Sequence, residues 1–209
     1  MISKRLSTIA SLLKGRRIID VGADHGDFEQ YVVNHNLADK VVAVENKEGP
    51  YFRLTKAVNK LDKVKPILSD GLAMLSEDIE VIVLAGMGGN LIVNILKKDF
   101  DKTKNVKQVL VDAHRDSPKV RKFLLENGFK IEKEIIVHEK KKHYFIISFV
   151  RGNQKLKESE LLFGYKTNKD PLWANYYKMT YRLYSRLYAL NNSDSTLNLL
   201  RRLEEHEHD

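Results

Sequence analysis

The stretch Asp20-Val21-Gly22-Ala23-Asp24-His25-Gly26, which directly follows the apolar run Ile18-Ile19, decides the fold of this chain. A short apolar run that passes into an acid and a glycine-containing turn is typical of a buried parallel strand. Open parallel sheets bind their ligands outside the carboxyl ends of the strands. The stretch therefore predicts an α/β fold with a binding site at this turn.

Two more acids follow the next two apolar runs. Glu45 closes the run at residues 41–44, and Asp70-Gly71 follows Ile67-Leu68. A carboxylate at the end of a strand can accept hydrogen bonds from ribose hydroxyls or from an ammonium group. Three such acids on successive strands indicate a site for an adenosine ligand that bears a positive charge, and S-adenosylmethionine is the leading candidate. Acids and glycines after strands are also ordinary turn residues, so the order of the three acids carries the argument.

The first turn differs from a dinucleotide-binding turn. A site for NAD or FAD is expected to carry the pattern G-x-G-x-x-G after the first strand. This chain has Gly22 and Gly26 with Asp24 between them. A carboxylate in that position would meet the pyrophosphate of a dinucleotide, so the pattern favours a ligand without phosphate.

Length, apolar content and cysteine content exclude several classes of protein. A chain of 209 residues can hold one full α/β domain and a further segment. It has no cysteine, which excludes disulfides and thiolate metal sites, and we expect no metal. The apolar runs are too short to span a membrane. The first residues lack the pattern of a secretion signal, so we expect a cytoplasmic protein.

The chain is basic, with a net charge of +8 and an isoelectric point near 9.4. Lysine and arginine side chains that contact phosphates release counterions, so a basic protein suits a polyanionic partner such as a nucleic acid. Most of the positive excess lies in residues 1–150. A solvated, lysine-rich surface without such a partner is the alternative interpretation, and charge alone leaves it open.

Strand-like and helix-like patterns alternate through the first part of the chain. Apolar, partly β-branched runs predict strands at 16–21, 40–45, 64–68, 80–84 and 108–111. Helices are predicted at 7–14, 27–34, 49–61, 91–98 and 118–126. The block Gly86-Met87-Gly88-Gly89 is expected to end the fourth strand. Two strand-like runs at 129–139 and 143–150, joined by Lys140-Lys141-Lys142, then predict a hairpin.

Arg151-Gly152-Asn153 marks a predicted boundary between a domain at 1–152 and a helical appendage at 153–209. The appendage is expected to hold helices at about 156–167, 171–190 and 194–205. Two stripes in the long helix recur at steps of three and four: Tyr177, Tyr181, Tyr184 and Tyr188, and beside them Tyr176, Thr180, Leu183, Leu187 and Leu190. Such stripes predict packing in a coiled-coil-like hairpin, although the tyrosines could instead stack on bases.

With these motifs in place, the chain resembles the bacterial tRNA (adenine-22-N1)-methyltransferase family. The resemblance spans about residues 6–150, and the block after the fourth strand is its most specific element. The matching residues are those at 6–10 and 20–25, Glu45-Asn46, Gly49-Pro50, Asp70-Gly71-Leu72, Ala85-Gly86-Met87-Gly88-Gly89, Arg121, Glu139 and Tyr144.

The resemblance implies both an activity and a fold. The activity is S-adenosylmethionine-dependent methylation of N1 of an adenine in the D-arm region of tRNA. The fold is a Rossmann-like class I methyltransferase sheet that ends in an antiparallel hairpin strand. The resemblance further implies that residues 153–209 form a coiled-coil-like tRNA-binding appendage, and we expect a monomer.

The motifs and the resemblance together define an expected site. The loop residues expected to bind the cofactor are Asp20, Gly22, Asp24, Glu45, Asn46, Asp70, Gly71, Ala85 and Gly86, and those expected near the reacting atoms are Asp24, His25 and Met87. Adenine N1 already carries a lone pair, so it needs no general base, and positioning can supply most of the acceleration. A nearby carboxylate could steady the transient cation.

One segment departs from the family's pattern. The family usually has Gln-Pro after the fifth strand, where this chain has Asp112-Ala113-His114. That segment is expected to border the active site. Two other functions therefore stay open: methylation of a different substrate, and a non-catalytic module that binds S-adenosylmethionine and RNA.

Overall fold

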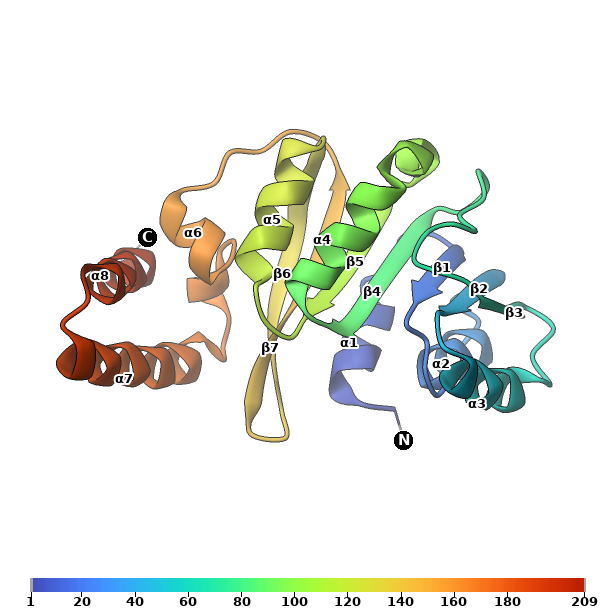
Figure 1. Ribbon diagram of the computed structural model, residues 1–209, viewed down its shortest axis with the longest axis horizontal. Helices are drawn as coiled ribbons and strands as arrows, with labels where there is room; N and C mark the ends of the chain where they lie inside the picture. The colour runs from blue at the N-terminus through green and yellow to red at the C-terminus, as the bar shows by residue number, and fades with distance from the viewer. Residues whose placement is uncertain (1, 209) are drawn as a thin grey trace.

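In the computed structural model, which describes residues 2–208, the chain folds around one seven-stranded sheet with helices on both faces (Figure 1). The strand order is β3-β2-β1-β4-β5-β7-β6. The first five strands along the chain pair in parallel, and β7 runs antiparallel to both β5 and β6. The strands are β1 (Arg17–Val21), β2 (Lys40–Glu45), β3 (Val64–Leu68), β4 (Val81–Met87), β5 (Gln108–Ala113), β6 (Phe129–Glu139) and β7 (Lys142–Arg151). The predicted Rossmann-like sheet with a terminal hairpin is confirmed.

The α-helices are α1 (Lys4–Ser11), α2 (Asp27–Asn34), α3 (Glu48–Val58), α4 (Gly89–Lys98), α5 (Ser117–Glu126), α6 (Glu158–Phe163), α7 (Trp173–Asn191) and α8 (Asp194–His208). Two short 3-10 helices lie at Phe100–Asn105 and Thr167–Lys169. None of the helices within residues 2–208 has the length and apolar content needed to cross a membrane.

Each face of the sheet has its own hydrophobic core, because the parallel strands are apolar on both faces. On one face α1, α2 and α3 pack on the sheet through residues such as Ile9, Val32 and Leu54. On the other face α4 and α5 pack through residues such as Ile92 and Val120. The two layers hold the carboxyl ends of β1 and β4 together at the same edge of the sheet.

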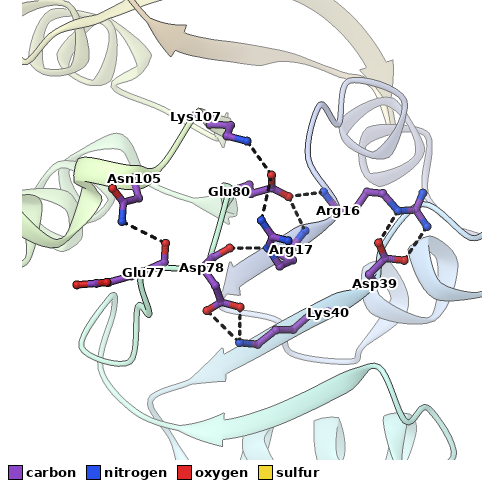
Figure 2. A network of polar contacts seen from close by, with 9 residues as sticks. All are labelled: Arg16, Arg17, Asp39, Lys40, Glu77, Asp78, Glu80, Asn105 and Lys107. Atoms are coloured by element: carbon purple, nitrogen blue, oxygen red, sulfur yellow. Dashed lines mark hydrogen bonds and ion pairs between the residues drawn. The ribbon is translucent and has the colours of Figure 1, made fainter.

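At the opposite edge, polar side chains fix the amino-terminal ends of the strands (Figure 2). The carboxylate of Glu80 accepts a hydrogen bond from the Lys107 ammonium at 2.9 Å and one from the backbone N–H of Arg16 at 3.1 Å. The Lys40 ammonium lies 2.9 Å from the carboxylate of Asp78. Bonds to Lys40 and Ser76 lower the pKa of Asp78 to about 2. This network is structural and lies away from the carboxyl ends of the strands.

The fourth strand is longer than the sequence predicts. It continues through the glycine block to Met87, with Ala85 opposite Asp112 and Met87 opposite Ala113. Gly86 is the extra residue of a β-bulge between these two pairs and has a φ of +78°. A glycine adopts this conformation without strain, so Gly86 bends the strand, which then ends within the block at Met87. The expectation that the strand stops at Leu84 was wrong.

The segment after residue 152 packs on the same core as α4 and α5. Phe163, Trp173 and Leu203 are buried members of that cluster. Within α7, Tyr176, Tyr177 and Tyr184 pack against it, and Figure 1 shows α6, α7 and α8 grouped beside α5 and the β6–β7 hairpin. In the second predicted stripe, only the first part is covered. Thr180 is buried, whereas Leu183, Leu187 and Leu190 are exposed, so the predicted packing of these leucines is wrong.

Candidate active site

A cavity of about 430 Å³ opens at the carboxyl ends of β1 and β4. Its walls come from the first turn, from the end of β4, from α1, from the segment after β5 and from the hairpin tip. The lining residues are Ser3, Arg5, Leu6, Asp20, Gly22, Ala23, Asp24, His25, Asp27, Phe28, Ala85, Gly86, His114 and Lys140. Of the expected site residues, Asp20, Gly22, Asp24, His25, Ala85 and Gly86 therefore lie around one hollow.

The floor of the cavity is acidic. Asp20, the residue before the last in β1, is nearly buried, and its neighbour Glu29 on α2 is completely buried. The pKa of Asp20 is raised to about 6, mainly by burial; a hydrogen bond with Glu29 opposes this rise and the negative charge of Glu45 adds to it. Burial also raises the pKa of Glu29 well above its usual range, and the charge of Asp20 adds to this rise. The two carboxyl groups thus form a coupled pair that favours a proton or a cation.

The next acid stands at the rim of the cavity. The Asp24 carboxylate is half-exposed and bonds the Arg53 guanidinium at 3.0 Å. The His25 ring nitrogen Nε2 lies 3.4 Å from the other carboxylate oxygen of Asp24. Asp24 has a φ of +44°, a left-handed conformation that Asp tolerates better than most residues. Both side chains can therefore reach an incoming ligand, and neither is buried beneath the cofactor region.

The acid at the end of β2 holds the first turn in place. The Glu45 carboxylate atom Oε1 accepts the backbone N–H of Asp24 at 2.6 Å, and the side chain is nearly buried. Asn46, which follows it, is exposed. Neither residue belongs to the cavity lining found among residues 2–208. Their assignment as cofactor ligands stays a prediction, and the structure adds a turn-fixing role for Glu45.

The third acid is engaged by a lysine. The Asp70 carboxylate lies 2.6 Å from the Lys98 ammonium of α4, and both side chains are largely exposed. Asp70 raises the pKa of Lys98 through this hydrogen bond. The next residue, Gly71, is buried against Ile95. Neither Asp70 nor Gly71 belongs to the lining of the cavity in the described part of the chain, so their contact with a ligand is also still a prediction.

Met87 lies close to the first turn. A Cβ atom on Gly22, whose φ is +85°, would lie 3.1 Å from the Met87 methyl carbon Cε. The side chain of Met87 packs on the core beneath this turn, and the lining of the cavity within residues 2–208 does not include it. Its predicted place beside the reacting methyl group stays a prediction.

Sequence reasoning missed two residues of this region, Arg5 and Glu29. Arg5 lies on α1 and contacts residues more than 100 positions away. Glu29 lies on α2 two residues after Asp27, where a helix commonly carries acids in its first turn. A buried acid has no local sequence signal, so only the packing of α2 against β1 reveals it.

The residues of the cavity fit S-adenosylmethionine. Its volume falls within the range of about 300–1,000 Å³ typical of small-molecule sites. Asp20 and Asp24 line the cavity, and their carboxyl groups suit a ligand with ammonium and sulfonium groups. Glu29 is buried beside Asp20, and the two carboxyl groups share a hydrogen bond. No cluster of three or more metal-ligating side chains occurs within residues 2–208.

Comparison with known proteins places this geometry in a family. Residues 2–147 match the family described as a methyltransferase domain. The tRNA (adenine(22)-N(1))-methyltransferase of Bacillus subtilis (strain 168) is 27% identical over 158 residues. That match covers 73% of this chain and 66% of the relative, so the matched region spans just under two thirds of the relative's length.

Solved structures agree along the whole chain. A Streptococcus pneumoniae protein, proposed as a tRNA (m1A22) methyltransferase, has a TM-score of 0.94 at 29% identity, with full coverage of both chains. The same protein in complex with S-adenosyl-L-methionine has a TM-score of 0.92 at 30% identity, again with full coverage. The acidic floor, the bulged end of β4 and the likeness over all helices and strands lead to one conclusion: the chain belongs to the tRNA (adenine-22-N1)-methyltransferase family of methyltransferase-domain proteins.

Proposed function

We propose that this chain methylates N1 of adenine 22 in tRNA with S-adenosylmethionine as the methyl donor. The observation that carries the proposal is the cavity at the ends of β1 and β4, where acids from the first turn stand opposite the bulged glycine segment. The relatives that bear this activity in their names share the fold over most or all of the chain. When bound, the cofactor supplies an electrophilic methyl group.

The residues of the chain provide binding and positioning. Asp20 and Asp24 offer carboxylates to the positive charges of the cofactor, and Gly22 keeps the first turn open. The bulge at Gly86 leaves room above β4, where a Cβ would meet no atom within 4 Å among the described residues. A planar base can approach there with its ring nitrogen in line, and most of the rate enhancement then comes from orientation.

In this proposal, residues at the rim of the cavity respond to the charge and the acidic proton that methylation creates on the base. Methylation of N1 leaves a positive charge on the base and makes its N6 amino group more acidic. The half-exposed carboxylate of Asp24 and the ring of His25 stand where they can stabilise this charge or accept the proton. Met87 supports the turn and, in this proposal, borders the methyl group.

Residues 153–209 are proposed to help hold tRNA as a helical appendage to the domain at 1–152. Arg182, Arg186 and Arg201 are exposed on its helices, whereas Arg202 is bound to Glu158 at 2.5 Å. Exposed arginines without a carboxylate partner are the better phosphate ligands. We further propose that the protein acts as a monomer in the cytoplasm.

The test is direct. The protein is incubated with isotope-labelled S-adenosylmethionine and two tRNA transcripts that differ only at position 22, with adenine or guanine. Nucleoside analysis should detect N1-methyladenosine only in the adenine transcript. An Asp20→Asn/Asp24→Asn variant is the matched negative control for contaminating activity. Methyl transfer to the guanine transcript, or cofactor and tRNA binding without transfer, would replace the proposal by one of the two alternative functions.

A further inference from the structure

The cavity has a second wall that the cofactor residues do not explain. Ser3, Arg5 and Leu6 of the leader segment, His114 after β5 and Lys140 at the hairpin tip line this side. These residues come from three distant parts of the chain and converge opposite Asp20 and Gly86. His114 belongs to the segment where the chain departs from the Gln-Pro pattern. The wall and the proposed cofactor residues therefore border the same cavity.

The guanidinium of Arg5 is held rigidly in this wall. Its Nη1 atom is closely paired with the Asp112 carboxylate, which is fully buried. Its Nε atom donates to the Glu139 carboxylate at 2.9 Å, and the backbone N–H of Lys4 donates to the same carboxylate at 2.8 Å. Two carboxylates on two edges fix the plane of a guanidinium group, because each bond is directional.

One face of this plane lies on an aromatic ring. The Arg5 carbon Cζ is 4.6 Å from the centre of the Tyr144 ring. The side chain keeps 20% of its surface exposed and lines the cavity. With Tyr144 against one face and carboxylates along the edges, the surface that Arg5 offers to the cavity is flat and preorganised.

The bonds of Arg5 disfavour the usual role of an arginine in an RNA-binding protein, which is to bind a phosphate. Its Nη1 and Nε atoms already donate to the carboxylates of Asp112 and Glu139. These two donors are therefore not free for a phosphate. A planar, uncharged base is suited to the site, and so is the cationic base that methylation of N1 produces.

His114 lies at the edge of the Arg5 guanidinium plane. Arg5 Nη1 lies 3.0 Å from His114 Nε2, and an arginine can only donate. Nε2 is therefore the acceptor in this contact, and it also lies 3.7 Å from the Asp112 carboxylate. The ring centre of His114 lies 5.2 Å from that of Tyr144. His114 thus borders the plane of Arg5 where both side chains line the cavity.

We propose that Arg5 is the stacking platform for the target adenine, with Tyr144 behind it and His114 at its edge. Guanidinium planes and aromatic rings are the surfaces on which unstacked RNA bases are held. The inference rests on the proposed function, because it identifies the part of the cavity that receives the tRNA base. Asp112 and Glu139 are positioning residues that act through Arg5.

The test compares planar with non-planar cations at residue 5. Arg5→Lys keeps the positive charge but loses the plane, and Arg5→Ala removes both. Arg17→Lys, in the network at the opposite edge of the sheet (Figure 2), is the matched control. Cofactor affinity by calorimetry and tRNA affinity by filter binding should stay within twofold of wild type. Methyl transfer under saturating conditions should fall about 5- to 150-fold in both Arg5 variants, as expected for loss of one stacking contact.

A second measurement distinguishes stacking from a structural role. Millimolar guanidinium ion, added to Arg5→Ala, should restore part of the methyl-transfer rate, whereas methylammonium should not. If Arg5→Ala does not fold because Asp112 is left unpaired, the double variant Arg5→Ala/Asp112→Asn takes its place in the rescue. Equal rescue by both cations, or Arg5→Lys with the activity of Arg17→Lys, would overturn the inference. A wild-type protein that methylates no tRNA would overturn the proposed function itself, and this outcome is separate because it needs no variant.

Discussion

Arg121 on α5 and Glu134 on β6 form an ion pair in which both side chains are fully buried, with Nη2 2.5 Å from Oε1. The same guanidinium donates from Nη1 to the carbonyl of Leu161 at 2.9 Å. The Glu134 atom Oε2 accepts the backbone N–H of Tyr165 at 2.8 Å. One charged pair therefore connects the methyltransferase sheet to the first helix of residues 153–209, which makes the arrangement of the two parts depend on it.

Replacement of Arg121 should destabilise the protein strongly. Arg121→Met leaves the Glu134 charge buried without its partner, and such a loss costs about 3–5 kcal/mol. Urea unfolding measures the change. The double variant Arg121→Met/Glu134→Leu should recover much of the loss because no charge stays buried. Lys122→Ala, which breaks only an exposed pair with Glu126, is the control with an effect below about 1 kcal/mol. A double variant as unstable as the single one would contradict this account.

The buried acid on α2 should make stability depend on pH. The pKa of Glu29 is raised in the folded protein, so the folded state binds a proton more tightly than the unfolded chain does. Folding therefore loses stability as pH rises above the unfolded value near 4.3. Glu29→Gln removes this cost and should raise the melting temperature at pH 8, by about 2–4 °C for each kcal/mol relieved.

The comparison for Glu29 is made across pH. Thermal unfolding of wild type and Glu29→Gln should converge near pH 4, where the wild-type carboxyl is protonated in both states. Glu126→Gln, a largely exposed acid on α5, should follow the wild-type curve. A difference between wild type and Glu29→Gln that does not change from pH 4 to pH 8 would mean that charge burial is not its cause.

The lysine on α4 should compete with the cofactor for Asp70. The two side chains lie 2.6 Å apart on the surface, so their contact contributes at most about 1 kcal/mol. If Asp70 accepts a hydrogen bond from the cofactor, Lys98→Gln frees it and should tighten cofactor binding by up to about fivefold. Calorimetry measures the affinity, and Lys97→Gln serves as the control. Weaker binding in Lys98→Gln would show that the lysine assists the ligand.

Glu45 should be essential for the cofactor site. Its carboxylate fixes the backbone of Asp24, and as a prediction it also accepts the ribose hydroxyls. Loss of a hydrogen bond to a charged group costs about 1.5–3 kcal/mol, so Glu45→Ala should weaken cofactor binding roughly tenfold or more. Glu48→Ala, on the exposed first turn of α3, is the control. Unchanged affinity in Glu45→Ala would remove both roles.

The arginines of the appendage should differ in their effect on tRNA binding. Arg186 is exposed on α7, whereas Arg202 is paired with Glu158 and Glu205. Arg186→Gln should reduce the slope of log affinity against log salt by about 0.7–0.9, the value for one phosphate contact. Arg202→Gln should leave the slope unchanged. Equal slopes in all three proteins would place the phosphate contacts on the methyltransferase domain.

The sheet could be predicted from the sequence, but most of the cavity's second wall could not. Strand ends such as Asp20 and Glu45 could be predicted because parallel strands are short apolar runs and the residue after each run faces the ligand edge. Gly86 was read as a break because a bulge and a turn use the same residue type. Arg5 could not be placed, since its partners Asp112 and Glu139 become neighbours only in the folded sheet.

The prediction that the leucine stripe on α7 is packed was wrong for a related reason. Spacing at three and four residues indicates a seam, but it does not specify how far the partner helix extends. Tyr177 and Tyr184 pack against the core cluster that contains Leu203 of α8, whereas Tyr181, Leu183 and Leu190 are left in contact with solvent. The repeat in one helix shows which residues share a face of that helix. Whether those residues are buried depends on the element that packs against the face.

The position of Ser3 on the cavity wall has a practical consequence for how the protein is produced. Any affinity tag or fusion partner joined ahead of this residue begins at the rim of the cavity, within a few residues of Arg5. A tag at that end would compete with a bulky RNA for the same opening and could lower the measured turnover of an otherwise intact enzyme. A handle that is cleaved off before assay leaves this opening free.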